Sequence, residues 1–245
     1  MKIIKTTASL AILKEKINTE NKVFYIRFGD NDIFQMTGIG RKGRSIQGKS
    51  IGSNRTLYSS RLANDIKASF IIKDDNFMKA VTLDWDLEEG MTGRLFGRKK
   101  PQVLYKYVRK FTDEEIFYHP VVFHYLFIFH RSLFEDFLDN YINTRKVLFV
   151  GRMTYPGRMF KNYKQIKTKD ENCYYDDRDR VLKQIQHSQF DIIILACGQL
   201  GRAIAHELWN MDRNFHCIDL GSIVDYYDGR VTRGWIRKIK KLELI

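Results

Sequence analysis

Two carboxylates follow a short apolar segment near the start of the chain. Residues 23–28 combine β-branched and aromatic side chains, which favour a strand, and Gly29 separates that strand from Asp30 and Asp32. Carboxylates at positions i and i+2 of a turn can converge on Mg²⁺ or Mn²⁺, which then takes further oxygens from a substrate diphosphate. Arg27 can pair with Asp30 or with a phosphate. The alternative interpretation is an ordinary strand end with polar turn residues.

A second group of acidic residues lies in the segment 83–89. Asp84, Asp86, Glu88 and Glu89 stand close together there, around Trp85. Such a density of carboxylates could supply a general base, and the indole could stack on a sugar ring. A solvated acidic turn around a core tryptophan is the alternative.

Positive charge is clustered along the chain. The formal net charge is +13, which attracts anionic partners such as nucleotides, nucleic acids or acidic membranes. Three basic runs contain no acidic residue, and a solvated basic surface is the alternative interpretation of each. The runs comprise Arg41, Lys42, Arg44, Lys49, Arg55 and Arg61; then Arg94, Arg98, Lys99, Lys100, Lys106, Arg109 and Lys110; and finally Arg230, Arg233, Arg237, Lys238, Lys240 and Lys241.

The elements that must position these residues are clearest in the second half of the chain. Continuous apolar runs alternate there with helical patterns, which predicts a parallel sheet with crossover helices, a Rossmann-like α/β fold. Ligands of such sheets bind at the carboxyl ends of the strands. The expected strands cover residues 146–151, 191–196 and 215–218, and the expected helices cover residues 177–187 and 202–209.

The first half is less regular. Helices are expected at 10–17 and 59–70, a strand or short helix at 76–83, and one or two helices within 117–138. Glycines punctuate the basic segment 38–52, which predicts a ligand-facing loop. The histidines of the segment 117–138 lack the helical spacing of a metal pair, so structural roles are expected. They are His119, His124 and His130.

Composition limits the class of protein. A chain of 245 residues with 44% hydrophobic and 13% aromatic residues is long enough to bury a core and is not disordered. Its three cysteines fit a reducing compartment. The first residues contain no apolar run as long as that of a signal peptide, and no apolar run is long enough for a membrane-spanning helix. We therefore expect a cytoplasmic protein with one domain, 1–245, made of a metal- and phosphate-binding half, about 1–140, and a parallel-sheet half, about 141–245.

The motifs resemble those of bacterial glycosyltransferases of the GT-D fold type. The run Arg27-Phe28-Gly29-Asp30-Asn31-Asp32 is similar to the arginine–aromatic–glycine–Asp–Gly–Glu signature of that family. The segments 192–198, 203–208 and 218–223 are similar in order and spacing to its C-terminal strand, helix and Asp-Ile-Gly-His-type motif. The resemblance covers most of the chain and is specific at its two ends.

Several positions depart from the family pattern. Asp32 replaces a glutamate, Asn31 replaces a glycine, and Ser222 replaces a histidine. Gln199 and Leu200 replace the usual proline and threonine. These changes indicate a divergent member whose donor and acceptor can differ from those of its relatives.

The resemblance implies a metal-dependent transferase that moves a sugar from a nucleotide-sugar donor, UDP-linked by family analogy, to a glycan, lipid-linked or protein-linked acceptor. Asp30 and Asp32 would hold Mn²⁺ or Mg²⁺ and act in catalysis, with Asp84 and Asp86 as further catalytic candidates. The expected donor-binding residues are Arg27, Gly29, Arg41, Arg44, Lys49, Gly198, Gln199, Asp219 and Ser222.

Other interpretations stay open. The basic runs, with aromatic residues interleaved around 105–111, could bind nucleic acid or serve an enzyme that modifies DNA or RNA, including a glycosyltransferase with a nucleic-acid acceptor. Another nucleotide-binding enzyme with a parallel sheet, such as a methyltransferase, is a further alternative. The amphipathic segment 230–241 could dock on the anionic inner face of a membrane or on an acidic acceptor, or it could pack on the core as a terminal helix.

Overall fold

The described residues form one parallel sheet in which both halves of the chain take part. The computed structural model describes residues 2–38, 59–81, 107–169 and 174–241. All paired strands run parallel, in the order β1-β4-β3-β2-β8-β7-β5-β6. The strands are β1 (Lys2–Ile4), β2 (Phe24–Phe28), β3 (Phe77–Val81), β4 (Ile116–Tyr118), β5 (Val147–Gly151), β6 (Tyr163–Lys167), β7 (Ile192–Ala196) and β8 (His216–Asp219).

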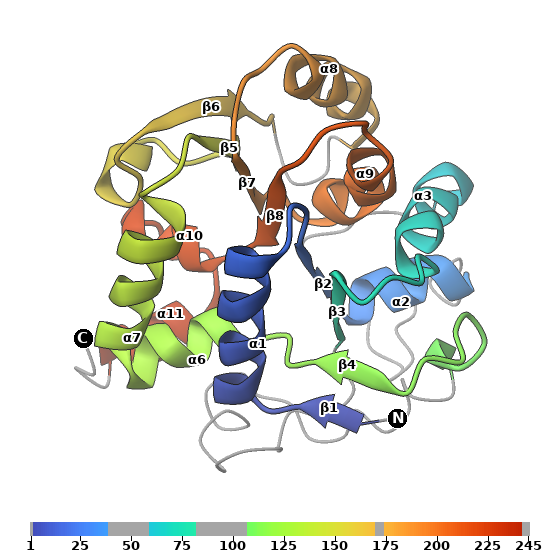
Figure 1. The fold of residues 1–245 in the computed structure, drawn as a ribbon, viewed down its shortest axis with the longest axis horizontal. Coiled ribbons are helices and arrows are strands. Elements are labelled where there is room, and N and C mark those ends of the chain that lie inside the picture. Colours follow the sequence, from blue (N-terminus) through green and yellow to red (C-terminus); the bar gives the residue numbers. More distant parts are fainter. Residues whose placement is uncertain (1, 39–58, 82–106, 170–173, 242–245) are drawn as a thin grey trace.

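Helices cover both faces of this sheet (Figure 1). One apolar core lies beneath α2 (Asp30–Thr37), α3 (Ser60–Phe70), α8 (Tyr174–Gln186) and α9 (Gln199–Trp209). The core on the other face lies beneath α1 (Thr6–Thr19), α6 (Val122–Phe129), α7 (Arg131–Phe137) with the π-helical turn η2 (Leu138–Ile142), α10 (Ile223–Tyr227) and α11 (Gly234–Lys241). A short 3₁₀ turn, η3 (Pro156–Arg158), follows β5.

The central strands are apolar along their whole length because helices bury them from both sides. Every residue of β5 is buried, and four of the five residues of β7 are. This burial explains why the continuous apolar runs predicted these strands. The predicted α/β fold with a parallel sheet is therefore confirmed.

Several elements differ from the sequence-based expectation. The segment 76–83 contains the strand β3, and 117–138 begins in a strand before its two helices. The expected helix at 202–209 starts three residues earlier, so Gln199 lies inside α9. The strands β1 and β6 and the helix α2 were not expected; α2 begins directly at Asp30, where the sequence indicated a turn.

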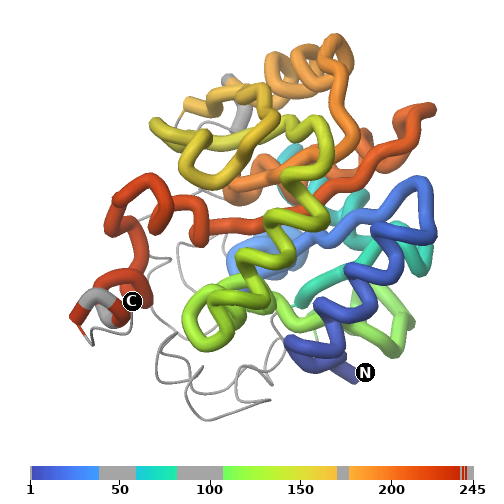
Figure 2. Tube along the Cα trace, turned by 60° about the vertical axis from the view of Figure 1, so that its left-hand side comes forward, coloured from blue at the N-terminus to red at the C-terminus, as the bar shows by residue number. Residues whose placement is uncertain are grey.

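The last described helix packs on the core. Trp235, Ile236 and Ile239 of α11 are buried, whereas Arg237 is exposed. The two ends of the described chain, β1 and α11, lie far apart in both views of the molecule (Figure 2). Among the described residues, no helix combines the length and the apolar character needed to cross a lipid bilayer.

Candidate active site

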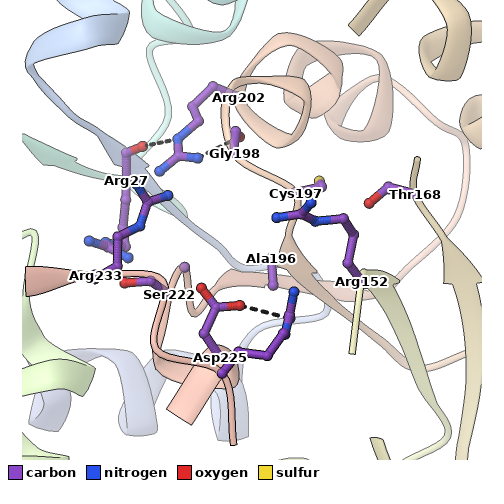
Figure 3. A pocket seen from close by; sticks show the side chains of 12 residues that line it. Arg27, Arg152, Thr168, Ala196, Cys197, Gly198, Arg202, Ser222, Asp225 and Arg233 are labelled. Atoms are coloured by element: carbon purple, nitrogen blue, oxygen red, sulfur yellow. Dashed lines mark hydrogen bonds and ion pairs between the residues drawn. The ribbon is translucent and has the colours of Figure 1, made fainter. Parts of the chain in front are cut away.

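Five arginines line one cavity at the carboxyl edge of the sheet. The cavity has a volume of about 190 Å³ and lies where β2, β5, β6, β7 and β8 end. Because β6 and β7 lie on opposite sides of β5, the order in which successive strands join the sheet reverses at this edge, and ligands of open α/β sheets bind at such points. Figure 3 shows Arg27 and Arg233 on one side of this space and Arg152 on the other. The lining residues are Arg27, Arg152, Thr168, Ala196, Cys197, Gly198, Arg202, Gly221, Ser222, Asp225, Arg230 and Arg233.

Arg27 is held at the end of β2 by neutral groups. Its Nε donates to the Pro120 carbonyl at 2.5 Å, and a terminal nitrogen donates to the Leu220 carbonyl at 3.4 Å. Among the described residues no carboxylate bonds it directly, and burial lowers the pKa of its guanidinium despite the nearby charge of Asp219. A partly buried cation in this position gains from an anion placed in the cavity.

Gly221 makes room for that guanidinium. Its φ is +60°, and a Cβ atom at this position would lie 1.8 Å from a terminal nitrogen of Arg27. Any larger residue would therefore strain the backbone and displace Arg27. The glycine is required for the position of the arginine.

Arg202 occupies a buried network behind the cavity. A terminal nitrogen of its guanidinium lies 3.1 Å from Asp219, and its Nε lies 3.5 Å from Asp32. The same Nε donates to the Arg27 carbonyl at 2.5 Å (Figure 3). Burial lowers the pKa of Arg202, but these two carboxylates outweigh it and raise the pKa above its usual value. Arg202 thus offsets part of the negative charge of Asp219 and Asp32 and fixes the end of β2.

Arg230 is ion-paired at the opposite wall. It lies 2.7 Å from Asp225 and 2.7 Å from Asp228. Asp228 also accepts the backbone N–H groups of Thr154 and Tyr155, so it ties this wall to the loop after β5. With five arginines against one aspartate, the lining of the cavity carries an excess of positive charge.

Asp30 and Asp32 lie in the first turn of α2, where negative charge is favourable. One oxygen of Asp32 accepts the Gly29 N–H at 2.7 Å, and its other oxygen is buried without a hydrogen-bond partner. Burial raises the pKa of the Asp32 carboxyl, and Arg202 and the Gly29 amide oppose this effect. Asp30 is half-buried.

Asp30 and Asp32 carry the hard oxygen donors that Mg²⁺ and Mn²⁺ prefer, and one buried oxygen of Asp32 has no hydrogen-bond partner. Side chains two positions apart in a helix do not face each other, so α2 does not by itself direct both carboxylates at one ion, as the expected turn would have done. No cluster of three or more histidine, cysteine, aspartate or glutamate ligands occurs in the described part of the chain. A cation here would therefore depend on a substrate for most of its ligands.

The structure brings several predicted donor-binding residues together. Arg27, Gly198 and Ser222 line the cavity, and Asp219 lies directly behind it. Gln199 lies at the start of α9, and its buried side chain lies against the Asp32 carboxyl. Gly29 is used as the N-cap of α2. Arg41, Arg44, Lys49, Asp84 and Asp86 lie outside the described residues.

Sequence reasoning missed Arg152 and Arg202 as parts of the site. Arg152 directly follows the strand β5, which is a signal that could have identified it. Arg202 lies within α9, and nothing in its sequence context shows that it reaches two distant aspartates. Cys197 also lines the cavity, but burial raises the pKa of its thiol to about 12, so it is protonated and no nucleophile.

Comparisons with known proteins identify the fold. No protein-family model and no curated protein matches the chain. Solved structures of domain of unknown function 1792 do match: one selenomethionine-substituted structure is 17% identical over 94% of this chain and 83% of its own, with a TM-score of 0.62. A second structure, described as having a distinct glycosyltransferase fold, is 14% identical over the same shares, also with a TM-score of 0.62. A glycosyltransferase from Streptococcus sanguinis with this domain is 14% identical over 93% of this chain and 84% of its own, with a TM-score of 0.66.

These similarities extend over nearly the whole chain, so they define its architecture. The chain has the glycosyltransferase fold of domain of unknown function 1792. The resemblance predicted from the sequence motifs is confirmed at the level of the fold.

Proposed function

We propose that this chain is a glycosyltransferase that moves a sugar from a nucleotide-sugar donor to an acceptor hydroxyl. The observation that carries the proposal is the cavity at the carboxyl edge of the sheet, lined by five arginines, in a chain with a glycosyltransferase fold. A nucleoside diphosphate is the anionic group that such a donor carries and that the reaction releases.

The arginines would stabilise the leaving group. Cleavage of the bond between the sugar and the diphosphate places negative charge on phosphate oxygens, and guanidinium groups bind such oxygens with two parallel hydrogen bonds. Arg27, Arg152 and Arg233 would make these contacts from different walls of the cavity. Because Arg27 is partly buried and is held in place beforehand by two backbone carbonyls, it needs little reorganisation as the charge develops.

A divalent cation is part of the proposal. Asp30 and Asp32 would hold Mn²⁺ or Mg²⁺, with phosphate oxygens of the donor as further ligands, and the ion would neutralise charge on the leaving diphosphate. The orphaned oxygen of Asp32 supports this assignment. Arg202 lies 3.5 Å from Asp32, so it would hold this carboxylate in place before a metal binds.

The small cavity favours a nucleotide over a nucleic acid. A volume of about 190 Å³ suits a diphosphate, whereas nucleic-acid backbones bind along open basic grooves. The donor would be UDP-linked and the acceptor a glycan, free or linked to lipid or protein. A lipid-linked acceptor would place the protein at the anionic inner face of a membrane.

A thermal-shift panel tests the proposal. UDP-, GDP-, dTDP- and CMP-sugars are each added with and without Mn²⁺, because a ligand that binds only the native state raises the melting temperature. We expect stabilisation by one nucleotide class, larger in the presence of the cation. Absence of any shift with all four classes would contradict the proposed function.

A further inference from the structure

Ser222 joins the wall of the cavity to a buried histidine. Its Oγ lies 3.1 Å from Nε2 of His124 on α6 and accepts the indole N–H of Trp235 on α11 at 3.2 Å. Ser222 is also the N-cap residue of α10, yet its side chain makes no capping hydrogen bond. The hydroxyl therefore does not cap the helix, as a serine at this position usually does, and hydrogen-bonds to the imidazole instead.

The hydrogen-bonding roles around this hydroxyl are constrained. The Trp235 indole can only donate, so it occupies one lone pair of Oγ. When Nε2 of His124 carries no proton, the Ser222 hydroxyl donates to it, and the remaining lone pair of Oγ is available on the side of the cavity. A serine in this arrangement can take a proton from a ligand while it passes its own proton to the imidazole.

The charges around His124 determine when its imidazole can accept a proton. His124 is buried, and this burial, together with the nearby guanidinium groups of Arg27 and Arg233, lowers its pKa well below its usual value. Both arginines line the cavity. An anion bound between them would offset their charge and so make protonation of His124 more favourable.

We propose that Ser222 and His124 form a proton relay that serves as the general base of the transfer reaction. The acceptor hydroxyl gives its proton to Ser222 Oγ while the Ser222 proton moves to His124 Nε2. The acceptor oxygen forms the new bond to the anomeric carbon, and the bond from that carbon to the diphosphate breaks, with its electron pair leaving on the phosphate. His124 then returns its proton to solvent through Ser222. Ser222 is the catalytic residue, and His124 acts through it.

The relay rests on the proposed function and couples the base to the donor. In the empty cavity the imidazole is a weak base between two cations. It becomes a stronger base when the anionic donor is bound, so proton removal follows donor binding. An acceptor or a water molecule is thus activated only beside a donor.

Three variants of the full chain test the relay by steady-state kinetics, with the donor that the thermal-shift panel identifies. We expect Ser222→Ala and His124→Gln to lower kcat by about 10²- to 10⁴-fold, the usual range for loss of a general base, with the affinity for the nucleoside diphosphate unchanged. Ser222→Thr keeps the hydroxyl and should keep most of the activity. In the wild type kcat should fall at acidic pH as His124 becomes protonated, and His124→Gln should lose that dependence.

Ser69→Ala is the matched control. Ser69 is buried and its Oγ also lies against a histidine, 3.5 Å from Nδ1 of His206, but this pair joins α3 to α9 and does not line the cavity. Its loss should leave kcat unchanged. Normal kcat in both Ser222→Ala and His124→Gln, with nucleotide binding intact, would overturn the relay and leave the proposed function standing.

Nuclear magnetic resonance gives a readout independent of turnover. The imidazole nitrogen signals of His124 are titrated with and without pyrophosphate as the probe anion. We expect the titration midpoint of His124 to rise when pyrophosphate binds. An unchanged midpoint in the presence of bound pyrophosphate would overturn the coupling, whereas failure of any anion to bind would contradict the proposed function itself.

Discussion

At the scale of single residues, Gly221 determines where Arg27 can lie. Gly221→Ala should displace the guanidinium, because its Cβ would lie 1.8 Å from a nitrogen of Arg27, and should add backbone strain of about 1–3 kcal/mol at a φ of +60°. Calorimetry should show a loss of pyrophosphate affinity. Gly229→Ala is the control, since Gly229 has a φ of +76° but no atom within 4 Å of the added Cβ. Gly229→Ala should lose stability and keep its affinity for pyrophosphate. Equal pyrophosphate affinities of the two variants would contradict this role of Gly221.

Substitutions of the two carboxylates of α2 are expected to have different effects. Asp30→Asn should abolish the Mn²⁺-dependent part of donor binding and leave the fold intact. Asp32→Asn should in addition lower the free energy of unfolding by about 1–3 kcal/mol, because it weakens the bond to the Gly29 N–H and the ion pair with Arg202. Denaturant titrations and donor binding with and without a chelator measure both effects. Full turnover in excess chelator would rule out the metal.

The sequence placed Arg27, Gly198 and Ser222 near the carboxyl ends of predicted strands. In the structure these residues line one cavity, because the carboxyl ends of parallel strands meet at one edge of the sheet. His124 was expected to be structural, and its contact with Ser222 was not predicted. Its spacing carries no metal signal, and its contact with Ser222 spans 98 positions of the chain, which local patterns do not encode.

At the scale of elements, the buried strands were predictable and the edge strands were not. β5 and β7 are continuous apolar runs, whereas β6 at the edge of the sheet is mostly exposed and contains two lysines. The helix α2 was missed because a glycine followed by Asp-Asn-Asp is typical of a turn. The same residues also suit a helix start, with Asp32 accepting the N–H of the N-cap Gly29.

The large apolar side chains that the structure describes in α11 are not available to a membrane. Trp235, Ile236 and Ile239 are buried in the core, so contact of the described part of α11 with lipid would come from its charges. We expect salt-sensitive co-sedimentation with vesicles that contain anionic lipid, reduced by Arg237→Glu with Lys241→Glu, both exposed. The two substitutions should leave the melting temperature nearly unchanged. Sedimentation of wild type and variant to the same extent would limit this helix to a structural role.

At the scale of the whole molecule, two buried histidines should make stability depend on pH. Burial lowers the pKa of His216 to about 4, with a further contribution from Arg145, and the pKa of His124 is also lowered. Between pH 6.5 and 4 the unfolded chain therefore binds more protons than the folded chain, so the free energy of unfolding falls as the pH falls. Each histidine can contribute up to about 1.4 kcal/mol per pH unit.

Denaturant titrations across this pH range measure the dependence. His216→Gln should make the slope of the free energy of unfolding against pH shallower below pH 6.5. Above pH 7 both histidines are neutral in the folded and the unfolded chain, so they should not make stability depend on pH. A slope that is the same in wild type and variant would show that His216 is not buried as a neutral group.

The proposed function depends on the basic cavity, and donor binding by the arginines of this cavity tests that function most directly. Isothermal titration calorimetry compares the affinity of the wild type for its nucleoside diphosphate with that of Arg152→Gln, of Arg233→Gln and of the double variant. Arg213→Gln is the control, because it removes the same charge from a residue that does not line the cavity and packs on Phe190. Each cavity substitution should weaken binding about 10- to 100-fold, as expected for a charged hydrogen bond, and the control should bind like the wild type. Unchanged affinity in the double variant would contradict the account.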